Sequence, residues 1–223
     1  FNMQVDPPAV LKIGELKDAS GKPQSITTKP EVTIVQNKRV LYIGTGRYLG
    51  EDDLVDGATL SPALQWAYQQ TIYAIKDKDA KYDNGAGSSN IRASSPGLVQ
   101  QVMTDSGGVR TITSNPVDWT NKDGWYVDLN PGNTSPGERV NLDPQLVLGT
   151  LVVVGNIPNN NACTVGGDSF IYFFDYRNGN APAGSPNGVV GEKQVGTTTV
   201  GVVAFCLQSG QCKGVATGAG GNQ

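Results

Sequence analysis

The chain has 223 residues, a formal net charge of −3, 29 glycines, 13 prolines and no histidine. This length can bury one sizeable core, and the many glycines and prolines favour an all-β protein with short strands and frequent turns. The absence of histidine excludes His-based catalytic triads and His-ligated zinc. Lys and Arg do not interleave with aromatics, so nucleic acid is not an expected partner. No apolar run reaches the length of a transmembrane helix.

Residues 1–30 are rich in Pro, Lys and small polar residues, and they predict a peripheral lead-in segment before a β domain at 31–223. The chain starts at Phe1 with neither an initiator Met nor a signal peptide. We therefore expect it to be a processed or excised segment of a longer protein.

Short runs of β-branched and aromatic residues predict strands from residue 32 onward. In the first part of the chain these runs are Val32–Val35, Val40–Ile43, Thr71–Asp77, Leu98–Met103, Val109–Thr113 and Gly124–Leu129. Ser61 before Pro62 predicts a short helix reaching Gln65. Residues 78–96 are polar and rich in Gly and Ser, which is typical of a long surface loop.

The most apolar run of the chain, Leu146–Val154, predicts one buried strand of nine residues. Further predicted strands are Phe170–Asp175 and a last hairpin formed by Val200–Leu207 and Cys212–Ala216, while residues 178–199 predict an irregular connection. About ten strands would make two to three blades of a β-propeller. A sandwich or a partly open barrel would use the same strands, so strand counting leaves these folds open.

One acidic loop is a weak candidate for calcium, because Asp52, Asp53 and Asp56 offer the oxygen ligands that this cation prefers. Their spacing matches no EF-hand loop, and a solvated acidic loop explains them equally simply. No other cofactor is expected. The preceding segment Gly44–Gly50 resembles a dinucleotide loop only superficially, since Leu49 stands where a third glycine is required.

The three cysteines predict a single disulfide. Cys206 and Cys212 lie on opposite arms of the last predicted hairpin, where a cross-strand bond is geometrically reasonable. Cys163 is left over, and it is free, paired with one of these two, or paired outside this segment.

No catalytic machinery is expected, because no serine has a histidine partner and no Gly-x-Ser-x-Gly elbow joins a strand to a helix. Trp66, Trp119 and Trp125 fit either a ligand-stacking surface or core packing. The loops at 78–96 and 178–199 are the better candidates for contact with a partner.

Several segments, taken together and in order, resemble the C-terminal propeller domain of the PilC/PilY proteins, the type IV pilus biogenesis factors and tip-associated adhesins. The segments are Arg39–Gly50, Thr71–Asp77, Asn115–Trp119, Gly124–Leu129, Gly137–Val140, Asp143–Leu146 and Cys163–Gly167, the last of these preceding the strand at 170–175. Residues 1–30 and 178–223 are less similar.

This resemblance implies a modified, partial β-propeller: the last few blades of a larger secreted protein. It implies a non-enzymatic role in pilus assembly, in opposing retraction and in surface attachment, at the pilus tip or outer surface reached through the periplasm. Implied partners are minor pilins, the rest of the parent protein, and a host or abiotic surface. The calcium loop of some family members, with Asp-x-Asp-x-Asn-x-Asp-Gly spacing, is absent from these 223 residues. A quinoprotein-dehydrogenase-like propeller and a carbohydrate-binding β domain are the alternatives.

Overall fold

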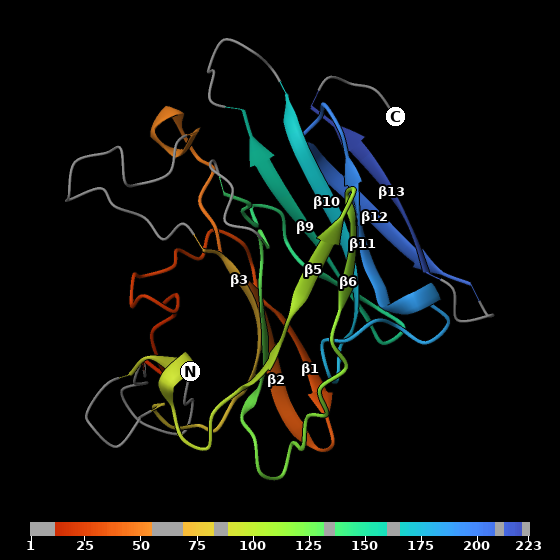
Figure 1. Cartoon of the computed structure of the whole chain (residues 1–223). Coiled ribbons are helices and arrows are strands. Elements are labelled where there is room, and N and C mark those ends of the chain that lie inside the picture. Colours follow the sequence, from red (N-terminus) through yellow and green to blue (C-terminus); the bar gives the residue numbers. More distant parts are fainter. Residues whose placement is uncertain are drawn as a thin grey trace.

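The computed structural model describes residues 12–54, 69–82, 89–131, 137–159, 166–207 and 212–219, and in these it is an all-β structure (Figure 1). The strands are β1 (Glu31–Val35), β2 (Lys38–Gly44), β3 (Thr71–Lys76), β4 (Val99–Gln101), β5 (Met103–Ser106), β6 (Val109–Ile112), β7 (Gly124–Asp128), β8 (Gln145–Val147), β9 (Thr150–Pro158), β10 (Gly167–Asp175), β11 (Val189–Gln194), β12 (Thr199–Cys206) and β13 (Cys212–Gly218). Three short 3₁₀ turns are η1 (Glu51–Leu54), η4 (Ile91–Ala93) and η5 (Pro186–Gly188).

These strands form three sheets, none of which closes on itself within the described residues. The first sheet has the order β1-β2-β3-β7-β4, the second β5-β6-β11-β10-β9-β8, and the third is the hairpin β12-β13. The three sheets are stacked face to face, and the hairpin lies on the outer face of the second sheet (Figure 1). The all-β fold expected from the sequence is confirmed, in an open and propeller-like arrangement.

The main core lies between the first and second sheets. It contains large buried side chains from both, including Tyr42, Trp125, Tyr172 and Phe174. Successive side chains of a strand point to opposite faces, so Ile171 and Phe173 of β10 face away from this core and toward the third sheet.

Residues 12–30, 77–82 and 89–98 lie near the outer face of the first sheet. Leu16, Tyr82 and Ile91 pack there against Ile43 and Tyr73. The loop expected at 78–96 is therefore anchored through buried side chains in its described part, rather than free in solvent. The helix predicted at 61–65 and the indole of Trp66 lie outside the described residues.

Three strand predictions were wrong in detail. The apolar run 146–154 is not one strand, because Leu148 and Gly149 form a turn with positive φ that separates β8 from β9. Leu148 is 80% exposed, so apolar character alone misplaced it. The run 98–103 is divided at Val102 between the two large sheets, and the connection predicted at 178–199 contains β11, a central strand of the second sheet.

One turn, Tyr176–Asn180, ties the two large sheets together. The Tyr42 hydroxyl and the Trp125 indole N–H both donate to the carbonyl of Tyr176, at 3.0 and 3.2 Å. The indole N–H of Trp119 donates to the carbonyl of Arg177 at 2.9 Å. Trp119 and Trp125 are both buried, so of the two interpretations of these indoles the structure supports core packing.

Candidate docking groove

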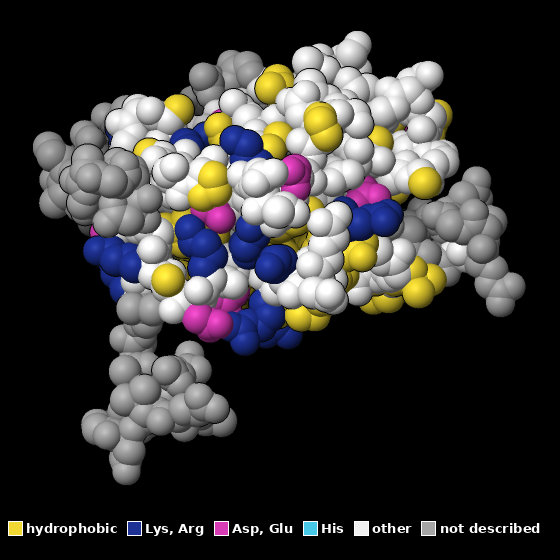
Figure 2. Space-filling model, turned by 90° about the horizontal axis from the view of Figure 1, so that it is seen from below, with side chains coloured by type: hydrophobic (Ala, Val, Ile, Leu, Met, Phe, Trp, Pro, Cys, Tyr) yellow, Lys and Arg dark blue, Asp and Glu magenta, His cyan; other side chains and the backbone are white. Residues whose placement is uncertain are grey.

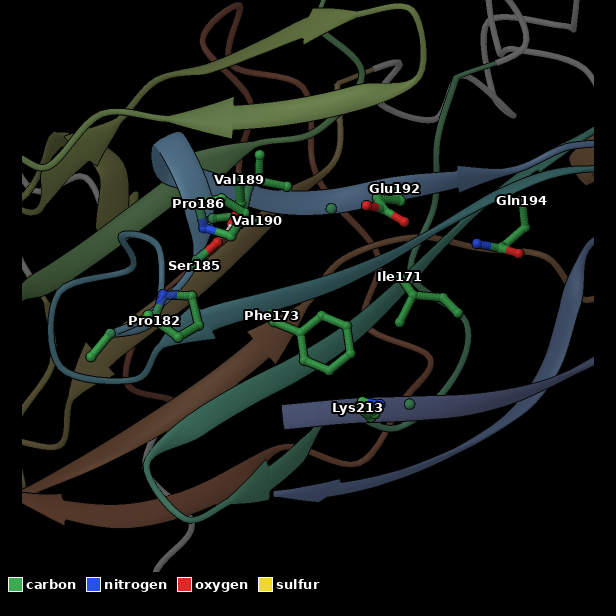
Figure 3. Close-up of a pocket in the computed structure, with 14 residues that line it drawn as sticks. Ile171, Phe173, Pro182, Ser185, Pro186, Val189, Val190, Glu192, Gln194 and Lys213 are labelled. Carbon is green, nitrogen blue, oxygen red and sulfur yellow. Dashed lines mark hydrogen bonds between the residues drawn. The ribbon is translucent and has the colours of Figure 1, made fainter. Parts of the chain in front are cut away.

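An open groove of about 690 Å³ runs along the outer face of the second sheet, beside the third. Its floor carries Ile171 and Phe173 of β10, and one wall is β13 with Lys213 and Gly214. Figure 3 shows Phe173 and Ile171 projecting into the space between β11 and β13. The groove exists because the hairpin covers β9 and β10 but leaves β11 open.

The far side of the groove is more polar than its floor. Glu192 and Gln194 of β11 lie along this side, and the segment from Pro182 to Pro186 forms its other end (Figure 3). Glu192 stands directly opposite Ile171 in the β10–β11 register, so both side chains face outward. The groove thus combines an apolar strip with one carboxylate.

The hairpin is anchored on the second sheet by two side-chain amides. The Gln145 amide donates to the carbonyl of Val202 at 2.7 Å and accepts from the N–H of Ala204 at 3.4 Å. The Asn156 amide likewise donates to the carbonyl of Thr199 and accepts from its N–H, at 2.8 and 2.9 Å. Each amide imitates the peptide group of a neighbouring strand and satisfies two peptide groups on this edge of β12.

The other face of the hairpin carries an exposed apolar cluster. Val203 and Val215 stand opposite each other in the β12–β13 register, and they are 68% and 59% exposed. Phe205 lies two residues further along the same face and is 43% exposed. An exposed apolar cluster of this kind on a two-stranded sheet is typical of a contact surface.

The loop proposed for calcium uses its central carboxylate internally. Asp53 is buried, and its Oδ2 accepts hydrogen bonds from the Arg47 guanidinium and from the backbone N–H groups of Leu49 and Gly50, while its Oδ1 lies 2.9 Å from Arg47 Nε. Asp53 therefore holds the loop at η1 in place. Asp56 lies outside the described residues, as does the side chain of Asp52, and calcium at this loop stays a prediction.

The two predicted disulfide partners face each other in the backbone. Cys206 and Cys212 are directly paired at the end of the β12–β13 ladder, while Cys163 lies outside the described residues. The bond between them remains a proposal.

A buried charge cluster lies between the two large sheets, and the sequence did not predict it. Glu138 accepts hydrogen bonds from the Arg110 guanidinium and, at 2.6 Å, from the Tyr172 hydroxyl. Arg110 also pairs with Asp105 and lies over the Phe170 ring, 3.5 Å from its centroid. Glu138 lies in the segment 137–140, and nothing in the local sequence of that segment indicates its distant partners.

Burial controls protonation in this cluster. Desolvation, reinforced by the Glu138 carboxylate, raises the pKa of the Tyr172 phenol well above its ordinary value. Desolvation opposes the charge on Arg110, but Glu138, Tyr172 and Asp105 together outweigh it and raise the pKa of the guanidinium. Since Tyr172 and Glu138 are both 0% exposed, we interpret the cluster as a structural one.

A second network lies on the outer face of the first sheet. Arg92 of η4 donates to both carboxylate oxygens of Asp128, at 3.0 and 2.6 Å, and its guanidinium lies 4.3 Å from the centroid of the Tyr126 ring. Burial raises the pKa of the neighbouring Tyr73 to about 12. The network fastens the 89–98 segment to the sheet.

Charges of both signs are mixed on the face seen in Figure 2, where Lys and Arg side chains lie next to Asp and Glu side chains. In the described parts of the chain, no three His, Cys, Asp or Glu side chains gather in a way that could hold a metal ion. Among the same residues, no helix is long and apolar enough to cross a membrane.

Comparisons with known proteins place the chain. No family model matches it. It is 30% identical over 176 residues to the type IV pilus biogenesis factor PilY1 of Pseudomonas aeruginosa strain PAO1, which covers 71% of this chain and 14% of that protein. A PilY1 homolog of Xylella fastidiosa is 28% identical over 179 residues, covering 77% of this chain and 11% of that protein. The chain thus spans about a seventh or less of the length of these relatives.

A solved structure supports the fold. The crystal structure of the P. aeruginosa PilY1 C-terminal domain superposes with a TM-score of 0.64 and 19% identity, covering 92% of this chain and 46% of that one. Stacked open sheets and this likeness define the class of the protein as a partial, propeller-like all-β domain. The chain belongs to the PilY1 family and corresponds to part of its C-terminal domain.

Proposed function

We propose that this chain is part of a type IV pilus biogenesis factor, and that it acts as a docking scaffold without catalysis of its own. The observation that carries the proposal is the 30% identity to a protein named as such, over 71% of the chain. The structure contributes the kind of surface that such a role needs: an apolar groove and an apolar hairpin face on a rigid β framework.

The more specific roles of the parent protein are proposed on the same family relationship. The parent protein supports pilus assembly, opposes retraction and mediates attachment to a host or abiotic surface, from an extracellular position at the pilus tip reached through the periplasm. Its partners are minor pilins and the rest of its own polypeptide. These roles rest on the family relationship.

Deleting the parent gene tests the assembly role. We expect loss of surface pili and of twitching, with both restored by the gene in trans. Unchanged piliation and motility would contradict the proposed role in pilus assembly.

A second deletion separates assembly from retraction. If the protein opposes retraction, also removing the retraction motor restores pili to the deletion strain. If pili stay absent, the role lies in assembly alone. Adhesion of the re-piliated double mutant then measures the attachment role, which requires binding to fall although pili are present.

A further inference from the structure

The two edges of the third sheet differ in whether their outward peptide groups are hydrogen-bonded. The directions of the backbone N–H and C=O groups show this difference. The N–H of Ala219 donates to the carbonyl of Thr198 at 2.8 Å, so that peptide group of the β13 arm points toward β12. Peptide directions alternate along a strand. Hence Val215 and Thr217 bond toward β12, whereas Gly214 and Ala216 direct their N–H and C=O groups away from it.

The opposite strand confirms this alternation. Val202 and Ala204 stand opposite Ala216 and Gly214, and Gln145 binds one outward group of each, the Val202 carbonyl and the Ala204 N–H. Side-chain amides therefore occupy part of the β12 edge. Across the described ranges, no hydrogen bond to the backbone of Gly214 or Ala216 is found, so the β13 edge is open.

The open edge borders the groove. Gly214 lies over β10, where a Cβ would come 3.3 Å from the Phe173 ring and 3.9 Å from Ile171. Neighbouring strands of a sheet are about 4.8 Å apart, and stacked sheets lie about 10 Å apart. A strand added to β13 would thus lie above β11 and fill the groove.

We propose that the groove receives an extended β-strand that pairs with the β13 edge through Gly214 and Ala216. Alternate side chains of this strand would face the floor. One of them is apolar, to pack on Ile171 and Phe173, and one is basic, to face Glu192, which has no ion pair in the described part of the chain.

We assign the strand to the rest of the parent polypeptide, so the inference rests on the proposed family role. The solved PilY1 domain is about twice as long as the region matched here. Within the described residues, the third sheet has two strands where its neighbours have five and six. A propeller blade has four strands, and an added strand continues a sheet already stacked on the second one.

Amide hydrogen exchange at single residues tests the assignment, with this 223-residue chain compared to a longer parent polypeptide that contains it. In the chain alone, the amides of Gly214 and Ala216 should exchange faster than those of Val215 and Thr217. In the longer protein we expect the first two to slow by at least about tenfold. Equal exchange in both proteins overturns the inference.

Other outcomes reject the assignment to the same polypeptide. Protection that appears only after purified minor pilins are added assigns the strand to a pilin. Protection that rises with protein concentration in the 223-residue chain assigns it to a second copy.

Two variants of the longer protein locate the strand. Ala216→Pro removes an outward N–H and should abolish protection of Gly214. Glu192→Lys changes a surface charge without touching the core and should reduce the protection, whereas Glu31→Lys on β1 is the matched control and should not.

The exchange measurement is independent of the pilus phenotype, so the two proposals fail separately. Protection with normal pili in the deletion strain would overturn the pilus role alone. Absent protection with lost pili would overturn the added strand alone.

Discussion

The interior of the protein contains buried polar and charged side chains as well as apolar ones. Arg110 and Glu138 have side chains 4% and 0% exposed, and they join strand β6 to the segment before β8. A buried ion pair is costly to desolvate, but removing one partner costs more because the other charge is left unpaired. The cluster therefore makes the relative position of these segments sensitive to a single side chain.

Glu138→Ala should lower the free energy of unfolding by about 3–5 kcal/mol, because it leaves the buried Arg110 charge without its buried carboxylate partner, and the remaining ion pair is with the partly exposed Asp105. Urea denaturation followed by tryptophan fluorescence measures the change. Lys12→Ala, which removes an exposed charge paired with Glu15, is the control and should leave the midpoint unchanged. Equal midpoints for the two variants would show that the cluster is not an important source of stability.

A glycine beside Trp125 offers a second test at this scale. Gly179 has φ +71°, and a Cβ there would lie 2.5 Å from the indole ring. Gly179→Ala should destabilise the protein by about 2–5 kcal/mol, combining the left-handed backbone with the collision. Gly196 has φ +77° and open space around it, so Gly196→Ala should cost only about 1–2 kcal/mol. Similar losses in both variants would mean that the turn moves away from Trp125 easily.

At the scale of elements, the sequence predicted strands well where one face is buried and turns carry the usual residues. Strands β1, β2, β3 and β7 lie within a residue or two of their predicted ranges. The errors arose where local character and tertiary position disagree. Leu148 is apolar yet lies in an exposed turn. Strand β11 contains Gly191, Glu192 and Lys193, and this polar composition predicted a loop although the segment forms a strand beside the groove.

The hairpin β12–β13 carries the disulfide prediction. Ala204 and Gly214 form a pair without mutual hydrogen bonds. Since pair types alternate along an antiparallel ladder, Cys206 and Cys212, two residues further on, form a pair of the same type. The Cα atoms of such a pair are about 4.5 Å apart. This separation suits a disulfide. Peptide mapping without reduction should recover the Cys206–Cys212 bond, with Cys163 free to react with an alkylating reagent.

Replacing both hairpin cysteines by serine should weaken the hairpin by about 2 kcal/mol, as expected for closing so short a loop. Faster amide exchange in β12 and β13, with little change in global unfolding, is the expected pattern. Recovery of Cys163 in a disulfide with either hairpin cysteine would contradict the pairing.

For the molecule as a whole, the sequence could establish the all-β class and the absence of histidine, but not the assembly of the sheets. The division of residues 98–106 between two sheets depends on contacts far along the chain, as does the Arg110–Glu138 pair. The groove could not be predicted for the same reason, since Ile171 and Gly214 are distant in sequence.

Stability should depend on pH in the alkaline range rather than near neutrality. With no histidine, no side chain of ordinary pKa near 6.5 is present, so stability should be flat from about pH 5.5 to 7.5. Burial raises the pKa of Tyr73 to about 12 and shifts those of Tyr42, Tyr82 and Tyr172 upward as well.

A folded-state pKa above the unfolded value means that the folded protein binds the proton more tightly. The resulting stability is complete below about pH 10, the pKa of an unperturbed tyrosine, and is lost as the pH rises through the folded values. Urea denaturation across pH, with phenolate absorbance recorded in parallel, should show unfolding and tyrosine ionisation together above pH 10. A stability step between pH 6 and 7 would contradict this account.

The side-chain amides of Gln145 and Asn156 decide which edge of the third sheet is open to a further strand. An edge on which side chains already bind several peptide groups is a poor place for a strand from another molecule to pair, a protection that other proteins obtain with prolines, bulges or inward-pointing charges. With one side finished in this way, any strand that joins the sheet must enter from the opposite side. The order of strands in the completed assembly is thus decided by two side chains that belong to a different sheet.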